Sequence, residues 1–189
     1  MYICVVNKLL LILFFIPLIS YGQNNFSLGE WKEYRTNKNG NSIKINYKLP
    51  IPFESTSQSY AIDNTNLAAS FLYNGNPSKA TFIQIYCTSI PSQFNIDENQ
   101  FFDDKKAIEN IINQIVPAPI NEIINYNIIK IGNQSYIEIY SITHDIQKQV
   151  NWVTIKNNYF INIVGTTLKD SFSSILPFLM EFKKFIKVE

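Results

Sequence analysis

Few residues in this chain are able to perform acid–base or nucleophilic chemistry. The sequence holds one histidine, His144, which is followed directly by Asp145. A Ser-His-Asp or Cys-His site would need that histidine, and the nucleophile motif G-x-S-x-G is absent. The same dipeptide separates two apolar, strand-like segments, so we place His144 at a hairpin tip as a solvated turn residue. A hydrolase is therefore the least favoured of the functions considered.

Three carboxylates could form an acid pair only if the fold brought them together: Glu54, Glu138 and Asp145. Glu138 differs from the other two because strand alternation puts it on the same side as Tyr136 and Tyr140. Two interpretations of Glu138 stay open. It lies at the edge or rim of a sheet, which we favour, or it is an acid with a shifted pKa inside a pocket.

Metal and phosphate sites have no clear signature. Metal ions need clusters of Cys, His or carboxylate side chains, and the nearest candidates are Asp97-Glu98 and Asp103-Asp104. We interpret both pairs as acidic residues near the start of a helix, where they complement the helix dipole. The six glycines form no phosphate-binding loop. We therefore assign no catalytic residue, no metal site and no cofactor, and the binding residues stay unknown.

The two cysteines are not expected to form a disulfide. Cys4 lies inside an N-terminal leader, described below, whose removal leaves Cys87 alone. In the segment TFIQIYCTS, Cys87 alternates in phase with Ile83 and Ile85, which is the pattern of one buried strand face. We interpret Cys87 as a small buried apolar residue rather than a nucleophile.

One stretch, residues 134–167, must position several of these side chains, and its pattern predicts three consecutive antiparallel strands. Asn157-Asn158 separates two apolar segments within it. Asparagine tolerates positive φ, so this pair predicts a two-residue turn that sets Lys156 opposite Tyr159. The turn thereby fixes the register of the last two strands.

That register places large apolar residues on both faces of the sheet. Trp152 faces Ile163 on one side, and Ile155 faces Phe160 on the other. A sheet with one wet face would alternate more cleanly between polar and apolar residues. We therefore expect both pairs to be buried and both faces to be covered, most simply by helices.

The remaining elements follow from hydrophobic period and from turn residues. Further strands are expected over residues 31–35, 42–47, 58–63, 67–73, 80–88 and 122–131. Apolar residues recur at helical spacing over residues 97–116, with Asp97 as the expected N-cap. The order of elements predicts one α+β domain over residues 31–189, preceded by a frayed arm over residues 23–30.

A last helix is expected after Thr167. Ser173 or Ser174 would cap it, so that Pro177 falls in or beside the first turn, where proline is tolerated. Its apolar stripe is expected to run as far as Ile186.

The first 22 residues have the pattern of a signal peptide. Lys8 precedes a short apolar run, and Ser20-Tyr21-Gly22 places small residues at a cleavage site before Gln23. The run is short for a membrane-spanning helix, so no stable membrane anchor is expected after cleavage. Loss of Lys8 lowers the 16 basic residues to 15, equal to the 15 acidic residues. A neutral chain is not expected to bind nucleic acid or an anionic membrane.

The order of elements resembles the Mog1/PsbP-like fold over residues 30–187. The segment YKLPIPF follows the first strands where that family has a Tyr-Pro and Trp pattern, although here the proline is delayed to Pro50 and Phe53 replaces the tryptophan. The resemblance implies an antiparallel sheet with helices on both faces, an α/β/α sandwich that ends in a C-terminal helix. Members include photosystem accessory proteins, a Ran-binding protein and bacterial envelope proteins. It therefore implies a non-enzymatic adaptor or accessory domain, and it transfers no functional residue.

Together these observations predict an exported protein, periplasmic or extracellular, that acts through a protein partner. The alternative is a carrier for a small apolar molecule, which would need an enclosed apolar pocket of roughly 300 Å3 or more. The chain is rich in aromatic residues, of which most are expected in the core. Those that could line a pocket or a contact patch include Trp31, Tyr34, Trp152 and Tyr159.

Overall fold

The computed structural model describes residues 27–38, 40–51, 53–55, 66–74, 81–91, 96–118 and 121–189. The expected leader over residues 1–22 and the expected strand over residues 58–63 lie outside the described residues. Strand β1 begins at Leu28, so the last three residues of the expected arm are strand rather than a frayed segment.

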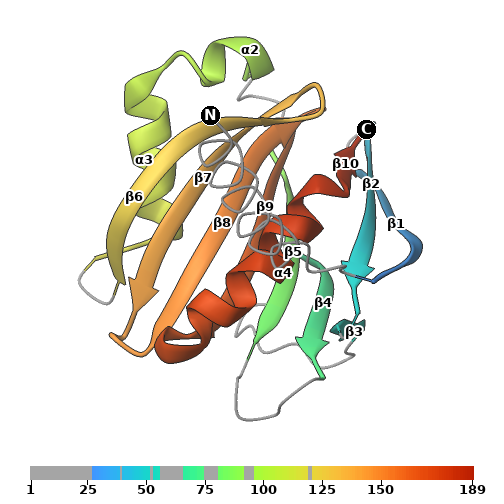
Figure 1. The fold of residues 1–189 in the computed structure, drawn as a ribbon. Coiled ribbons are helices and arrows are strands. Elements are labelled where there is room, and N and C mark those ends of the chain that lie inside the picture. Colours follow the sequence, from blue (N-terminus) through green and yellow to red (C-terminus); the bar gives the residue numbers. More distant parts are fainter. Residues whose placement is uncertain are drawn as a thin grey trace, which may run out of the picture.

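Seven antiparallel strands form the large sheet (Figure 1). From one edge to the other the strands are β3 Phe53–Ser55, β4 Leu67–Tyr73, β5 Phe82–Ser89, β9 Tyr159–Leu168, β8 Gln147–Lys156, β7 Gln134–Thr143 and β6 Asn121–Ile131. Four of these strands, β6 to β9, follow one another directly in the chain and form a continuous meander. The protein is therefore α+β with a large antiparallel sheet, as the sequence predicts.

The turns of the meander have the backbone conformation that their residues favour. His144, Asp145, Asn157 and Asn158 all have positive φ, between 50° and 60°, and so has Gly132. The β8–β9 register is the one predicted from the sequence, from Lys156 opposite Tyr159 through to Val150 opposite Gly165. Two-residue turns of this kind match the twist of the strands they join, which is why the register could be read from the asparagine pair.

One face of the large sheet is covered by helix α3, Lys105–Ile115. Its buried residues Ile108 and Ile112 pack on alternate residues of β7 and β8, including Ile137 and Val153. The single helix expected over residues 97–116 is instead divided, because α2 covers only Glu98–Phe101.

Asp104 accounts for the division between the two helices. Its carboxylate accepts hydrogen bonds from the backbone N–H groups of Lys106 and Ala107, at 2.9 and 3.1 Å, and so caps α3. The expectation that Asp97 caps a helix running to residue 116 is therefore wrong. Asp97 instead precedes the short helix α2, where its carboxylate accepts a hydrogen bond of 3.4 Å from the N–H of Gln100.

Helix α4, Phe172–Lys184, covers the opposite face (Figure 1). It buries Ile175, Leu179 and Phe182 completely against the sheet. Its N-cap is Ser171, which ends a short 3-10 turn, and not Ser173 or Ser174 as expected. Pro177 consequently lies inside the helix, beyond its first turn.

A second, three-stranded sheet stands beside α4 (Figure 1). It consists of β1 Leu28–Lys38, β2 Asn41–Pro50 and β10 Ile186–Val188, in that order. The sequence did not predict it, because Ile186 fits the apolar stripe of α4. The helix ends at Lys184, and backbone hydrogen bonds then link Lys44 and Glu189 in both directions, at 2.9 and 2.8 Å. These bonds satisfy backbone groups of β2 that would otherwise lack partners.

The inner face of the small sheet and α4 share one core with the large sheet. Ile43, Ile45, Tyr47 and Leu49 of β2 are all buried in it. The ring of Tyr47 lies 5.2 Å from that of Phe71 on β4 and so joins the two sheets. One expectation about burial is wrong. Trp152, Ile163 and Ile155 are fully buried, but Phe160 is only half-buried beside the α3 core.

Candidate functional site

Glu138 is buried beneath α4, so the favoured expectation that it lies at a sheet edge or rim is wrong. Its side chain is 8% exposed and pairs with Lys183 of α4, with the Nζ atom 2.7 Å from Oε1. The indole N–H of Trp152 on β8 donates to the same oxygen at 2.8 Å. The Lys183 ammonium also lies 5.9 Å from the centre of the Trp152 ring. Strand alternation and helix spacing together bring these three residues to one point.

The surroundings of Glu138 point to a structural role. Burial and the negative charge of Glu138 raise the pKa of Tyr140 to about 12, so this hydroxyl keeps its proton at neutral pH. The hydroxyl donates to the sulfur of Met180 on α4 at 3.8 Å. Glu138 and Tyr140 of β7 therefore both hold α4 against the sheet. The Glu138 carboxylate is buried and already bound to a lysine and an indole, so it is not placed to exchange a proton with a substrate.

The other candidate residues are dispersed over the fold. His144 is exposed at its turn, and its side chain makes no hydrogen bond or ion pair within the described residues. Asp145 pairs with Lys169 at 2.6 Å, and Glu54 accepts from the side-chain amide of Asn74 at 2.7 Å. The three carboxylates considered from the sequence thus have three separate sets of partners, and no acid pair forms.

Cys87 is buried on β5 as the sequence predicts. Burial raises the pKa of its thiol to about 11, so the thiolate that a nucleophile needs is scarce at neutral pH. Within the described residues there is no group of three or more His, Cys, Asp or Glu side chains that could hold a metal ion. Glu98, one of the helix-start acids, pairs instead with Lys156 at 3.1 Å.

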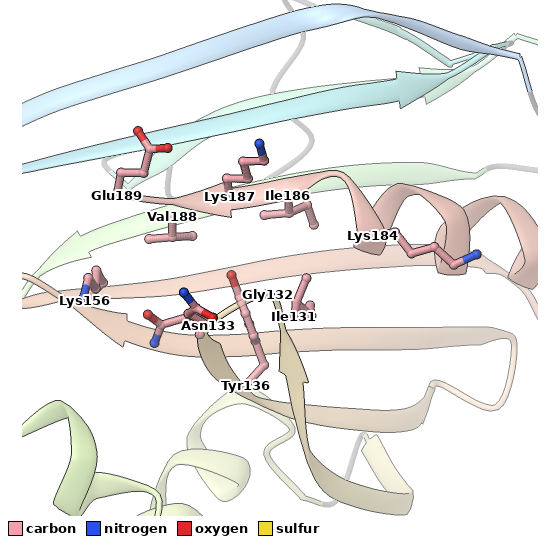
Figure 2. Close-up of a pocket in the computed structure, with 11 residues that line it drawn as sticks. Ile131, Gly132, Asn133, Tyr136, Lys156, Lys184, Ile186, Lys187, Val188 and Glu189 are labelled. Carbon is pink, nitrogen blue, oxygen red and sulfur yellow. The ribbon is translucent and has the colours of Figure 1, made fainter.

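A cleft of about 360 Å3 lies between β10 and the β6–β7 hairpin (Figure 2). Ile131, Tyr136, Ile186 and Val188 give it an apolar wall, and the hydroxyl of Tyr136 points toward β10. Burial raises the pKa of this hydroxyl. A second cleft, of about 460 Å3, shares Glu189 with the first. A third, of about 400 Å3, shares Asn133, Gln134 and Lys156 with it.

The lysines that line the first cleft direct their charges elsewhere. Lys156 binds Glu98, and Lys184 binds Glu181 at 2.8 Å. The ammonium of Lys187 lies 4.8 Å from the centre of the Trp31 ring, on the outer side of the small sheet. The cleft therefore gathers no uncompensated positive charge that would hold an anion.

The outer face of the small sheet carries the most unusual surface. Trp31 of β1 is 46% exposed, although tryptophan is usually well covered. Lys48 and Lys187 place their ammonium groups 5.2 and 4.8 Å from the centre of its ring, and Phe185 meets it edge to face at 6.4 Å. Neither lysine has a carboxylate partner among the described residues. We call these four residues the tryptophan surface.

Comparison with known proteins gives structural matches only. No protein-family model matches the sequence, and no curated protein sequence matches it. The cyanobacterial PsbP protein, CyanoP, of Synechocystis aligns over 89% of this chain and 96% of its own, with a TM-score of 0.55 and 14% identity. LpqN of Mycobacterium tuberculosis aligns over 85% and 92%, with a TM-score of 0.54 and 11% identity. The chain has the Mog1/PsbP-like fold. At these identities the likeness shows the fold and transfers no site residue.

Within the Mog1/PsbP-like fold, the tryptophan surface was only partly visible in the sequence. The aromatic content of the sequence points to Trp31 as a contact residue, but it does not indicate that Lys48, Phe185 and Lys187 lie beside it. The alternation of β2 already places Lys48 outward, because Tyr47 and Leu49 face the core. Phe185 and Lys187 reach the surface only because the chain leaves α4 and pairs with β2, a change that the helical period conceals.

No helix among the described residues is long and apolar enough to cross a membrane.

Proposed function

We propose that this protein is an exported, non-catalytic accessory domain that binds a protein partner through the tryptophan surface. The observation that carries the proposal is the exposure of Trp31 between two lysines that have no carboxylate partner in the part of the chain that the structure describes. Tryptophan and aromatic neighbours are enriched where proteins bind one another, because a large rigid ring buries much area at little cost in conformational entropy.

The chemistry of the surface indicates what the partner offers. The rings of Trp31 and Phe185 provide apolar contact area, and the ammonium groups of Lys48 and Lys187 provide positive charge at its centre. A partner with carboxylates beside an apolar side chain complements both features. The neutral charge of the mature chain makes nucleic acid an unsuitable partner.

The proposed envelope setting has two independent supports. The first is the signal-peptide pattern of residues 1–22, which predicts export. The second is the fold shared with LpqN, a protein involved in cell envelope biogenesis. An apolar carrier is less well supported, because each of the three clefts has charged side chains in its lining and none is the enclosed apolar chamber that a carrier needs.

Site-specific crosslinking in the producing cell tests the proposal. A photoreactive amino acid is placed at Asn46, which lies on the outer face of β2 between Glu33 of β1 and Lys187 of β10, two residues from Lys48. We expect one specific adduct with a second protein, which is lost in the Trp31→Ala variant and in the Lys48→Glu variant. A matched control carries the photoreactive residue at Ile146, an exposed hairpin position. An adduct that survives Trp31→Ala, or recovery of uncrosslinked chain alone, would contradict the proposal.

Export is tested separately. Mass spectrometry of the envelope fraction and of the medium should find a chain that begins at Gln23. A chain that keeps Met1 and stays in the inner membrane would overturn the proposed location while leaving the binding surface untested by that result.

A further inference from the structure

The four sheet edges of the described chain are not equally protected. A free edge strand exposes backbone N–H and C=O groups that can pair with another strand, and proteins usually protect such edges. Strands β3 and β10 are short, with three residues each. Strand β1 has 11 residues and carries the charged side chains of Glu30, Lys32, Glu33 and Arg35. These three edges are protected by length or by charge.

Strand β6 lacks that protection. It also has 11 residues, but its two charged residues, Glu122 and Lys130, lie near its ends. Between them the strand exposes Ile124, Tyr126 and Ile128, which are 50%, 38% and 50% exposed. Only three other large hydrophobic residues in the described chain are that open, and none of them shares a strand with another. The middle of β6 is therefore a long and apolar edge with which no other described strand pairs.

The regular part of β6 is complementary to itself. A bulge between Ile123 and Asn125 interrupts the pairing with β7, and Asn125–Ile131 then runs without irregularity. We propose that this segment pairs antiparallel with the same segment of a second copy of this chain, about a two-fold axis at Ile128. Every residue is then opposite one that points to the same face of the joined sheet.

The side chains meet favourably in this register. Ile128 lies opposite Ile128 of the second copy, and Tyr126 lies opposite Lys130 of the second copy, where the aliphatic stem and ammonium cover the ring. The two Lys130 side chains are four strand positions apart, about 13 Å along the strand, which exceeds the screening length of about 8 Å at physiological salt. A parallel in-register pairing would instead place Lys130 opposite Lys130, which is unfavourable.

The dimer leaves the tryptophan surface free. Strand β6 and strand β1 lie on opposite sides of the molecule in Figure 1, so pairing at one edge does not cover the other. The dimer would therefore present two copies of the tryptophan surface. Its existence does not depend on the function proposed above.

Analytical ultracentrifugation of the mature chain over a wide range of concentration tests the dimer. We expect dimers that dissociate on dilution. Ile128→Lys places two like charges on the two-fold axis and should raise the dissociation constant by on the order of 100-fold. Ile146→Lys is the matched control, because Ile146 is an exposed isoleucine at a hairpin turn, and it should remain dimeric. Circular dichroism of both variants confirms that they fold.

Disulfide trapping tests the register. Ile128→Cys should give a disulfide-linked dimer under mild oxidation, whereas Ile146→Cys should not. Cys87 does not interfere because it is buried with a raised thiol pKa. A wild-type chain that stays monomeric at every concentration would overturn the proposal. So would a dimer that persists unchanged in Ile128→Lys, or an Ile128→Cys chain that forms no linked dimer.

Discussion

Leu179 of α4 lies directly over Gly165 of β9. A Cβ atom on Gly165 would stand 2.8 Å from both terminal carbons of the Leu179 side chain, closer than such atoms approach in proteins. Because Leu179 is fully buried, it has little room to move away. The absence of a side chain at Gly165 therefore sets how closely the helix approaches the sheet.

This contact predicts that Gly165→Ala destabilises the protein by about 1–3 kcal/mol through overpacking. Leu179→Ala alone should cost about 2–5 kcal/mol through the cavity that it leaves. In the double variant the new methyl group occupies part of that cavity, so the double variant should lose less than the two single losses combined. Urea denaturation of the four proteins measures this coupling. Simple additivity would show that the two side chains do not meet.

Truncation of an aromatic residue on each of the two faces of the large sheet should lower the stability of the protein by unequal amounts. Trp152→Ala removes a fully buried ring and should cost about 3–5 kcal/mol. Phe160→Ala removes a half-buried ring and should cost about 1–2 kcal/mol. Ile146→Ala, at an exposed position, serves as the control and should change stability by less than about 0.5 kcal/mol. Equal losses at Trp152 and Phe160 would contradict the observed difference in burial.

Removal of one charge from the buried ion pair of Glu138 and Lys183 should destabilise the protein much more than removal of both charges. Lys183→Met leaves the Glu138 carboxylate buried without a positive charge to compensate it, and should cost about 3–5 kcal/mol. The double variant Glu138→Leu/Lys183→Met removes both charges, and should recover most of that loss. Guanidinium denaturation of the single and double variants checks this. A double variant as unstable as Lys183→Met would show that the charges themselves are not the source of the loss.

Cys87 predicts a specific loss of stability in alkali. The folded-state pKa of its thiol is raised to about 11 from an ordinary value of 9.0, so the unfolded chain releases this proton first as the pH rises. Stability is then fully present below pH 9 and falls between pH 9 and about 11, by up to about 3 kcal/mol from this group. Denaturation at a series of pH values should show a shallower alkaline decline in Cys87→Val than in wild type. Parallel declines would contradict a buried thiol.

The parts of the fold that depend on local pattern were predictable from the sequence. Asn157-Asn158 and His144-Asp145 identify two hairpins, because few other residues adopt positive φ, and the register of β8 and β9 follows from the first. The apolar stripe that includes Ile108 and Ile112 identifies the helix on one face. These features need no knowledge of distant residues.

The parts that depend on distant contacts were not predictable. Residues 186–188 continue the apolar period of α4, and only the unpaired edge of β2 explains why they form a strand. Glu138 looks like a rim residue in sequence because its partner Lys183 comes from a helix 45 residues later. The sequence indicates only part of the tryptophan surface for the same reason, because Phe185 and Lys187 lie on either side of the change from helix α4 to strand β10.

The pairing of β10 with β2 also fixes the order of events as the chain is made. β2 gains its second neighbour only after residues 186–188 have emerged, and α4 closes the core just before them. A shorter nascent chain therefore holds its meander strands without the cover that completes them, and such long-range pairing is slow to form. The core of this fold is therefore completed only when its C-terminal segment, α4 with β10, has docked.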